Sequence, residues 1–241
     1  MAPVLTARGV VRRYGARAVI DGIDLDLSAG EVAVLLGENG AGKTTLMRAL
    51  AGELSLDGGS VAVVGVDLAR EPERARRGLV HVSQRPALAP LATLREHAEA
   101  LAGFRGLDPS WPVELAELAA ALRLADAIDA PVRALSGGMQ HKAALVLGLL
   151  ARPPLVMFDE PHTGLDVRSA LALRDLVRAR RAGGTAFLLA SHLAEATLAL
   201  ADRAVVLRGG RVGRVFGSDE LAGFCGDARH FEREVLAAMG D

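Results

Sequence analysis

The chain has 241 residues, of which 51% are hydrophobic, and this length and composition suit one large domain with a buried core. Its 28 Lys and Arg nearly cancel its 29 Asp and Glu, which excludes a global field that would attract nucleic acid or anionic lipid. The single cysteine, Cys225, excludes an intramolecular disulfide and fits a reducing compartment. No signal peptide is recognisable, and no apolar run approaches the roughly 20 residues of a spanning helix. We therefore expect a cytoplasmic protein.

The first part of the chain reads as strands around one short helix. Residues 19–30, VIDGIDLDLSAG, alternate apolar and polar positions, which is typical of a half-exposed antiparallel strand. Residues 31–36, EVAVLL, are continuously apolar after Glu31, as expected of a strand covered on both faces. A glycine-rich loop and a short helix ending near Gly52 follow. Residues 60–68 and 78–84 are expected to be two more strands.

Residues from about 86 to 150 have a helical pattern. Thr93 and Glu96 form a capping box, residues 113–128 are amphipathic, and a further helix is expected to begin at Ser136. We interpret this region as a helical lobe inserted into the strand-rich part. The sequence thus predicts an α/β fold with a mostly parallel sheet, an N-terminal antiparallel β-subdomain and the inserted lobe.

Strands and helices alternate again after the lobe. Residues 153–160 and 185–192 are expected to be buried strands, and residues 166–184 a helix capped by Asp166 with cations toward its C-terminus. Residues 203–216 predict a hairpin around Gly209 and Gly210. We assign residues 1–215 to one domain and residues 216–241 to a short C-terminal tail.

The loop at residues 37–44, GENGAGKT, matches the pattern G-x-x-x-x-G-K-[ST] between an expected strand and an expected helix. In such a loop, backbone N–H groups converge on phosphate, Lys43 neutralises the terminal phosphates, and the Thr44 hydroxyl can ligate Mg²⁺. The sequence therefore predicts a nucleotide site, although kinases, GTPases and transporters all share this loop. The expected contacts are Gly37, Asn39, Gly40, Ala41, Gly42, Lys43, Thr44 and Thr45.

Polar side chains at three strand ends are expected to complete the site. Asp159 ends a buried strand, where its carboxylate can hold Mg²⁺ through water, and Glu160 follows where it can polarise a nucleophilic water. This adjacent pair favours hydrolysis over phosphoryl transfer to a bound substrate. Gln84 and His192 close two other strands that point toward the same crevice.

A second glycine-rich helix start occurs at residues 134–140, ALSGGMQ, where Ser136 is the expected N-cap and no lysine is present. With this segment the motifs match a family: the chain resembles the ATP-binding cassette ATPases, the nucleotide-binding subunits of ABC transporters. The resemblance covers roughly residues 4–215. It rests on seven motifs, which are, in order, Tyr14, the Walker A loop at 37–44, Gln84, the signature Leu135–Met139, Asp159 with Glu160, the D-loop Gly164–Asp166, and His192.

The resemblance implies a role for each of these residues. Tyr14 would stack on adenine, Glu160 would be the general base, His192 would contact the γ-phosphate, and Gln84, with Thr44 and Asp159, would serve Mg²⁺. In this family two cassettes face each other head to tail, so the signature of one closes over the ATP of the other. The second loop needs no lysine because the partner's nucleotide is already neutralised. Residues expected to contact that nucleotide are Ser136, Gly137, Gly138 and Asp166.

The chain departs from the family pattern at three positions. Met139 stands where many members have glutamine, Leu147 where many have arginine, and His162 where Thr or Ser is usual. These changes concern the D-loop and the lobe rather than the ATP chemistry.

The expected function is an ATPase that binds ATP and Mg²⁺, dimerises with itself or a homologous cassette, and drives an integral membrane permease on another chain. It would lie at the inner face of the cell membrane through that permease, with no nucleic acid partner. Residues 93–96, T-x-R-E, and the lack of a C-terminal regulatory domain resemble the exporter branch of drug and haem exporters. A soluble cassette ATPase acting on DNA or the ribosome is the main alternative, disfavoured because such members usually carry two cassettes or coiled-coil arms. A P-loop small-molecule kinase would explain neither the signature nor Asp159 with Glu160.

Overall fold

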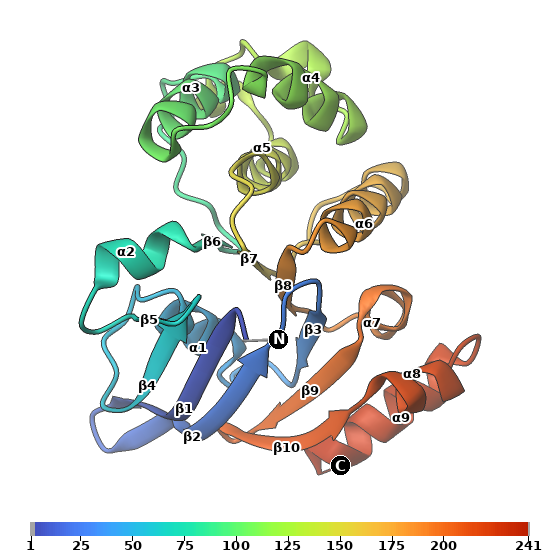
Figure 1. The fold of residues 1–241 in the computed structure, drawn as a ribbon. Helices are drawn as coiled ribbons and strands as arrows, with labels where there is room; N and C mark the ends of the chain where they lie inside the picture. The colour runs from blue at the N-terminus through green and yellow to red at the C-terminus, as the bar shows by residue number, and fades with distance from the viewer. Residues whose placement is uncertain (1–2, 241) are drawn as a thin grey trace.

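The computed structural model describes residues 3–240, which form two sheets surrounded by helices (Figure 1). The larger sheet has the strand order β10-β9-β3-β8-β7-β6, and all its pairs are parallel except β9 with β10. The smaller sheet, β2-β1-β4-β5, is antiparallel throughout. The expected α/β class, with a mostly parallel sheet and an N-terminal antiparallel subdomain, is confirmed. The strands are β1 (Leu5–Tyr14), β2 (Arg17–Leu27), β3 (Val32–Leu36), β4 (Gly58–Val63), β5 (Val66–Asp67), β6 (Leu79–Val82), β7 (Leu155–Asp159), β8 (Ala186–Ala190), β9 (Arg203–Arg208) and β10 (Arg211–Phe216).

The helices divide into a lobe and a set that lies along the larger sheet. Figure 1 shows α3 and α4 at the far end of the molecule from the antiparallel sheet, with α5 between them and the strands. No helix in residues 3–240 is both long and apolar enough to cross a membrane. The helices are α1 (Lys43–Leu50), α2 (Pro72–Arg77), α3 (Leu94–Arg105), α4 (Trp111–Ala121), α5 (Gly137–Leu150), α6 (Val167–Ala182), α7 (Ala194–Leu200), α8 (Ser218–Gly223) and α9 (Ala228–Met239), with short 3-10 turns at Ala125–Ala127 and Val132–Ala134.

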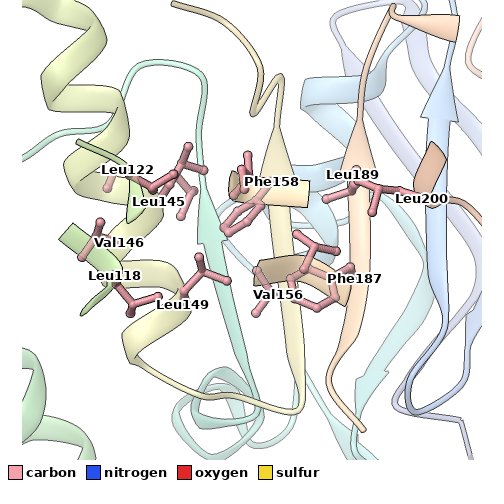
Figure 2. Close-up of a cluster of buried hydrophobic side chains, with 14 of the residues drawn as sticks. Leu118, Leu122, Leu145, Val146, Leu149, Val156, Phe158, Phe187, Leu189 and Leu200 are labelled. Atoms are coloured by element: carbon pink, nitrogen blue, oxygen red, sulfur yellow. The ribbon is translucent and has the colours of Figure 1, made fainter. Parts of the chain in front are cut away.

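The larger sheet has a hydrophobic core on each face. In β7, Val156 and Phe158 belong to the core that α4 and α5 cover, which Figure 2 shows. Leu155 and Met157 point the other way, into the core shared with α1 and the antiparallel sheet. A strand buried on both faces needs apolar residues at every position, which explains why the β3 and β7 sequences are continuous rather than alternating.

Two helix starts agree with their expected caps. The Thr93 hydroxyl accepts a hydrogen bond from the Glu96 N–H, and the Thr93 N–H donates to the Glu96 carboxylate at 2.7 Å. The Asp166 carboxylate accepts from the Ser169 N–H at 3.0 Å. These caps place α3 just after the loop that follows Gln84, and α6 just after the D-loop.

Two expected elements are shorter than the sequence suggested. The single strand expected at residues 60–68 is a hairpin, because Val64 and Gly65 have φ values of 50° and 73° and form a tight turn between β4 and β5. The helix expected at residues 113–128 ends at Ala121, because Arg123 has a φ of 60° and turns the chain. This turn brings Leu122 and Leu124 into the lobe core.

The segment after β10, expected to be a short tail, forms α8 and α9. Phe231 of α9 is fully buried, and its ring lies edge to face with that of Phe216 at a centroid distance of 5.3 Å. Val235, one helical turn later, is also buried. Apolar residues four positions apart therefore hold α9 against β9, β10 and α7.

Candidate active site

The loop between β3 and α1 approaches β2 closely. Gly42 has a φ of 106°, and a Cβ at this position would lie 2.8 Å from the Val19 carbonyl oxygen. Only glycine fits both the backbone conformation and the space. The first turn of α1 carries no acidic residue and no side-chain cap, so its N–H groups form a positive helix end that suits an anion.

Lys43 is the first residue of α1 and is held within the loop. Its ammonium donates to the carbonyl oxygens of Gly37 at 2.6 Å and of Glu38 at 3.2 Å, and the residue is 8% exposed. Burial lowers the pKa of Lys43, and the charges of Glu160 and Asp159 oppose this shift. The ammonium therefore lies beside both carboxylates, at the point where a phosphate chain would need a counter-charge.

Asp159 ends β7 with its carboxylate buried. The residue is 1% exposed, and its Oδ2 atom has no hydrogen-bond partner in the described part of the chain. A buried carboxylate oxygen without a partner is costly unless a cation or an ordered water satisfies it. The arrangement therefore fits Mg²⁺, which Asp159 would hold through water and Thr44 through its hydroxyl, and which would neutralise charge on the terminal phosphates.

Glu160 follows Asp159 in a strained conformation. Its φ of 52° is uncommon for a residue with a side chain, yet its N–H donates to the Ala190 carbonyl at 2.9 Å and so continues the pairing of β7 with β8. Its carboxylate lies 2.8 Å from Nδ1 of the exposed His192. The loop after β8 thus fixes the direction of the Glu160 carboxylate.

A pocket of about 210 Å³ lies between these elements. It brings together most of the residues that the sequence predicted for the nucleotide and Mg²⁺: Asn39, Gly40, Gly42, Lys43, Thr44, Thr45, Gln84, Asp159 and Glu160. Val19 and Glu38 also line it and were not among the expected contacts. Glu38 lies inside the predicted loop, and Val19 lies on β2, five residues after Tyr14.

Several predicted residues lie outside this pocket. Gly37 and Ala41 are buried behind the loop. Tyr14, at the end of β1, is half exposed, and the Arg12 guanidinium lies 5.0 Å from the centre of its ring. His192 reaches the site only through Glu160, and its other neighbours line a separate groove of about 710 Å³ between α6, α7 and α9.

The start of α5 forms a second positive helix end. Ser136 is its N-cap, with the hydroxyl accepting from the Met139 N–H at 3.3 Å, and the first turn has no acidic residue. Ser136 and Gly137 are exposed. The signature residues Ser136, Gly137 and Gly138 do not line the pocket at this chain's own phosphate loop, and the Ser136–Gly137 turn is accessible to a ligand from outside.

Asp166 also lies outside the pocket, and its carboxylate is occupied within the chain. It accepts hydrogen bonds from the Ser169 N–H at 3.0 Å and hydroxyl at 2.8 Å, and from the Lys142 ammonium at 2.7 Å. The Lys142 hydrogen bond is the largest cause that lowers the pKa of Asp166, followed by the bonds from Ser169. The carboxylate therefore serves α5 and α6 rather than this chain's nucleotide pocket.

Comparison with known proteins gives a consistent answer. The family model described as "ABC transporter" matches residues 20–163. An aliphatic sulfonates import ATP-binding protein of Paraburkholderia xenovorans is 40% identical, over 88% of this chain and 80% of its own length. A solved structure of an ATP binding subunit of an ABC transporter superposes with a TM-score of 0.90 at 28% identity, covering 99% of this chain and all of its own.

Other relatives are longer than this chain. An sn-glycerol-3-phosphate import ATP-binding protein of Rhizobium johnstonii is 35% identical over 92% of this chain, but over 60% of its own length. A daunorubicin resistance ATP-binding protein of Streptomyces coeruleorubidus is 37% identical over 85% of this chain and 64% of its own. The chain thus spans less than two thirds of these relatives. The family model covers more than half of this chain, and the sulfonate-import relative is 40% identical over most of both proteins; on these grounds the chain belongs to the ABC transporter family.

Proposed function

We propose that the chain is the ATP-hydrolysing subunit of an ABC transporter, which closes on a second cassette when ATP binds and drives a permease on another chain. One observation carries the proposal: α1 and α5 both begin at glycine-rich turns and have no acidic residue in the first helical turn, but only the α1 start shares a pocket with a lysine, Lys43, and with Asp159 and Glu160. The other, at Ser136, is exposed and turned away from that pocket. Each chain therefore contributes its Lys43 pocket to one composite site and its Ser136 turn to the other.

Within the proposal, the residues of the pocket divide the chemistry of hydrolysis. The phosphate loop and Lys43 bind the β and γ phosphates, and Asp159 and Thr44 would hold Mg²⁺, which would supply positive charge beside those phosphates. Glu160 accepts the proton of the attacking water while the bond between the γ phosphorus and the bridging oxygen breaks. His192 keeps the Glu160 carboxylate aimed at that water, as their 2.8 Å contact allows. Gln84 lines the same pocket and would also serve Mg²⁺.

The partner's Ser136 would complete each site. The Ser136 hydroxyl accepts from the Met139 N–H and keeps its own hydrogen to donate, so this helix end would stabilise charge on a γ-phosphate that Lys43 and Mg²⁺ would partly neutralise. A cassette of this fold has been solved as a dimer in a post-hydrolysis state with ADP and Pi, at 20% identity to this chain. That neighbour supports a dimer for this chain.

The permease is expected to dock on the lobe around residues 85–106, next to Gln84. Leu91 and Phe104 are 71% and 79% exposed there, so apolar surface is available for a partner. The chain would then lie at the inner face of the cell membrane through this contact. The T-x-R-E segment, which resembles the exporter branch, favours export as the direction of transport. The relatives include both import and export proteins. Uptake and efflux assays on the reconstituted complex with its permease separate the two directions.

Glu160→Gln tests the dimer directly. This change keeps the size of the side chain and removes the base, so ATP should bind and stay uncleaved. The variant should run as a monomer without nucleotide and as a dimer with Mg-ATP in size-exclusion chromatography at high protein concentration. Adding Ser136→Arg should abolish the dimer while each monomer still binds ATP, because the arginine fills the space for the partner's γ-phosphate.

The matched control is Ser218→Arg on the same Glu160→Gln background. Ser218 is an exposed serine at the start of α8, so the same new side chain is introduced far from both helix ends. This control should dimerise like Glu160→Gln alone. If Ser136→Arg leaves the dimer intact, the signature does not act on a partner's nucleotide and the proposal is wrong.

A further inference from the structure

The first two turns of α5 are fastened to the loop that follows Glu160. A Cβ on Gly138 would lie 2.8 Å from the Gly164 carbonyl oxygen, so the two backbones touch. The His141 ring contacts the Pro161 carbonyl through Nε2 at 3.3 Å. Lys142 donates to Asp166 at 2.7 Å. Three contacts thus span residues 161–166, the whole stretch between the catalytic glutamate and α6.

Lys142 is the charged member of this contact set. The residue is only 7% exposed, and a buried ammonium is stable only when it is paired and hydrogen-bonded. Its hydrogen bond in the structure goes to Asp166, which also caps α6 through Ser169. A single side chain of α5 therefore contacts the residue at which the D-loop ends and α6 begins.

We infer that Lys142 is a positioning residue that locks the Ser136 turn to the loop after Glu160, so that the two move as one body. The inference rests on the proposed function, in which Ser136 serves the partner's nucleotide and Glu160 serves the chain's own. A lock between them makes one chain's signature position depend on the state of its own catalytic loop. A change at one composite site then alters the position of the signature residues in the other through Lys142.

A second ion pair in the same region provides a matched control. Arg180 of α6 pairs with the mostly buried carboxylate of Glu114 in α4, near the opposite end of α6 from Asp166. Arg180→Met therefore removes a helix-to-helix ion pair of the lobe without touching either loop. Lys142→Met removes the lock, and Lys142→Arg retains the charge.

The first measurement is the dissociation constant of the Mg-ATP dimer on the Glu160→Gln background, by analytical ultracentrifugation. Lys142→Met should weaken the dimer at least roughly fivefold, the lower end of typical coupling between two sites. Lys142→Arg should restore it, and Arg180→Met should leave it unchanged. All variants should bind ATP as monomers with unchanged affinity, because Lys142 does not line the phosphate pocket.

The second measurement is the ATP dependence of hydrolysis with Glu160 intact. If the two sites report to each other, the reaction is cooperative, and Lys142→Met should reduce the Hill coefficient toward one while Arg180→Met should not. A purely structural role would lower the unfolding midpoint without changing the Hill coefficient. Equal dimer affinity and equal cooperativity in Lys142→Met and its parent would overturn the inference. Failure of Glu160→Gln itself to dimerise would instead overturn the proposed function.

Discussion

Lys43 is the cation among the residues that line the phosphate pocket, which also has three carboxylates, Glu38, Asp159 and Glu160. Lys43→Ala should abolish ATP binding, because the remaining charges repel a triphosphate. Titration with a fluorescent ATP analogue checks this. Arg48→Ala is the control, since it removes an exposed cation from the same helix. Wild-type affinity in Lys43→Ala would show that the nucleotide binds elsewhere.

His141 makes the stability of the fold depend on pH. Burial lowers its pKa below the ordinary 6.5, a shift that the hydrogen bond to Pro161 only partly opposes. The unfolded chain therefore binds more protons than the folded one just below pH 6.5, so stability should fall as the pH decreases through that value. His162 is shifted in the same direction, mainly by burial.

His141→Gln should make this pH dependence shallower, because glutamine stays neutral and can still donate to Pro161. Urea unfolding at several pH values between about 5 and 8 measures the slope, in the range where histidine titrates. His230→Gln is the control, since His230 is half exposed on α9. An unchanged slope in His141→Gln would mean that His141 is not the source.

At the scale of elements, α9 should contribute to stability because it is anchored by a buried aromatic residue. Phe231→Ala should reduce the free energy of unfolding by about 3–5 kcal/mol, the range for removing a buried phenylalanine. Phe104→Ala, at a position that is 79% exposed, should change it little. Denaturant unfolding compares the two. Equal small effects would show that α9 packs only loosely on the sheet.

Elements with strong local signals were predictable from the sequence. The continuous apolar runs gave β3 and β7, and the capping residues Thr93 and Asp166 marked where α3 and α6 begin. The failures have local causes as well. The Val64–Gly65 turn lies between valines that favour a strand, so there the turn outweighs the local pattern. The helical spacing of Phe231 and Val235 was present in the sequence, and α9 was overlooked rather than hidden.

At the scale of the whole molecule, the phosphate pocket was predictable because its residues lie in motifs at strand ends. Parallel strands bring these ends to one edge of the sheet. The ion pair of Asp166 with Lys142 was not predictable, because it joins residues 24 positions apart, one in α5 and one at the start of α6. The part played by Val19 depends on how closely Gly42 packs against β2, and that distance exists only in the folded chain.

The lobe surface gives a prediction for the assembled transporter. Leu91→Glu should reduce the fraction of the chain recovered with cell membranes, because it places a charge in the apolar surface proposed to meet the permease. Val215→Glu is the control, since Val215 is exposed on β10 at the far end of the molecule. ATP binding should be unchanged in both. Equal membrane recovery of both variants would place the permease contact elsewhere.

Because the backbone at Glu160 is left-handed, selection for stability and selection for activity favour different residues at this position. Glycine adopts a φ of 52° without steric cost, whereas a residue with a side chain loses roughly 1–2 kcal/mol there. A mutant library screened only for heat resistance should therefore enrich glycine at position 160. A library screened for growth that depends on the proposed ATP hydrolysis should exclude it, so the proposed catalytic base is a residue that selection for folding alone would replace.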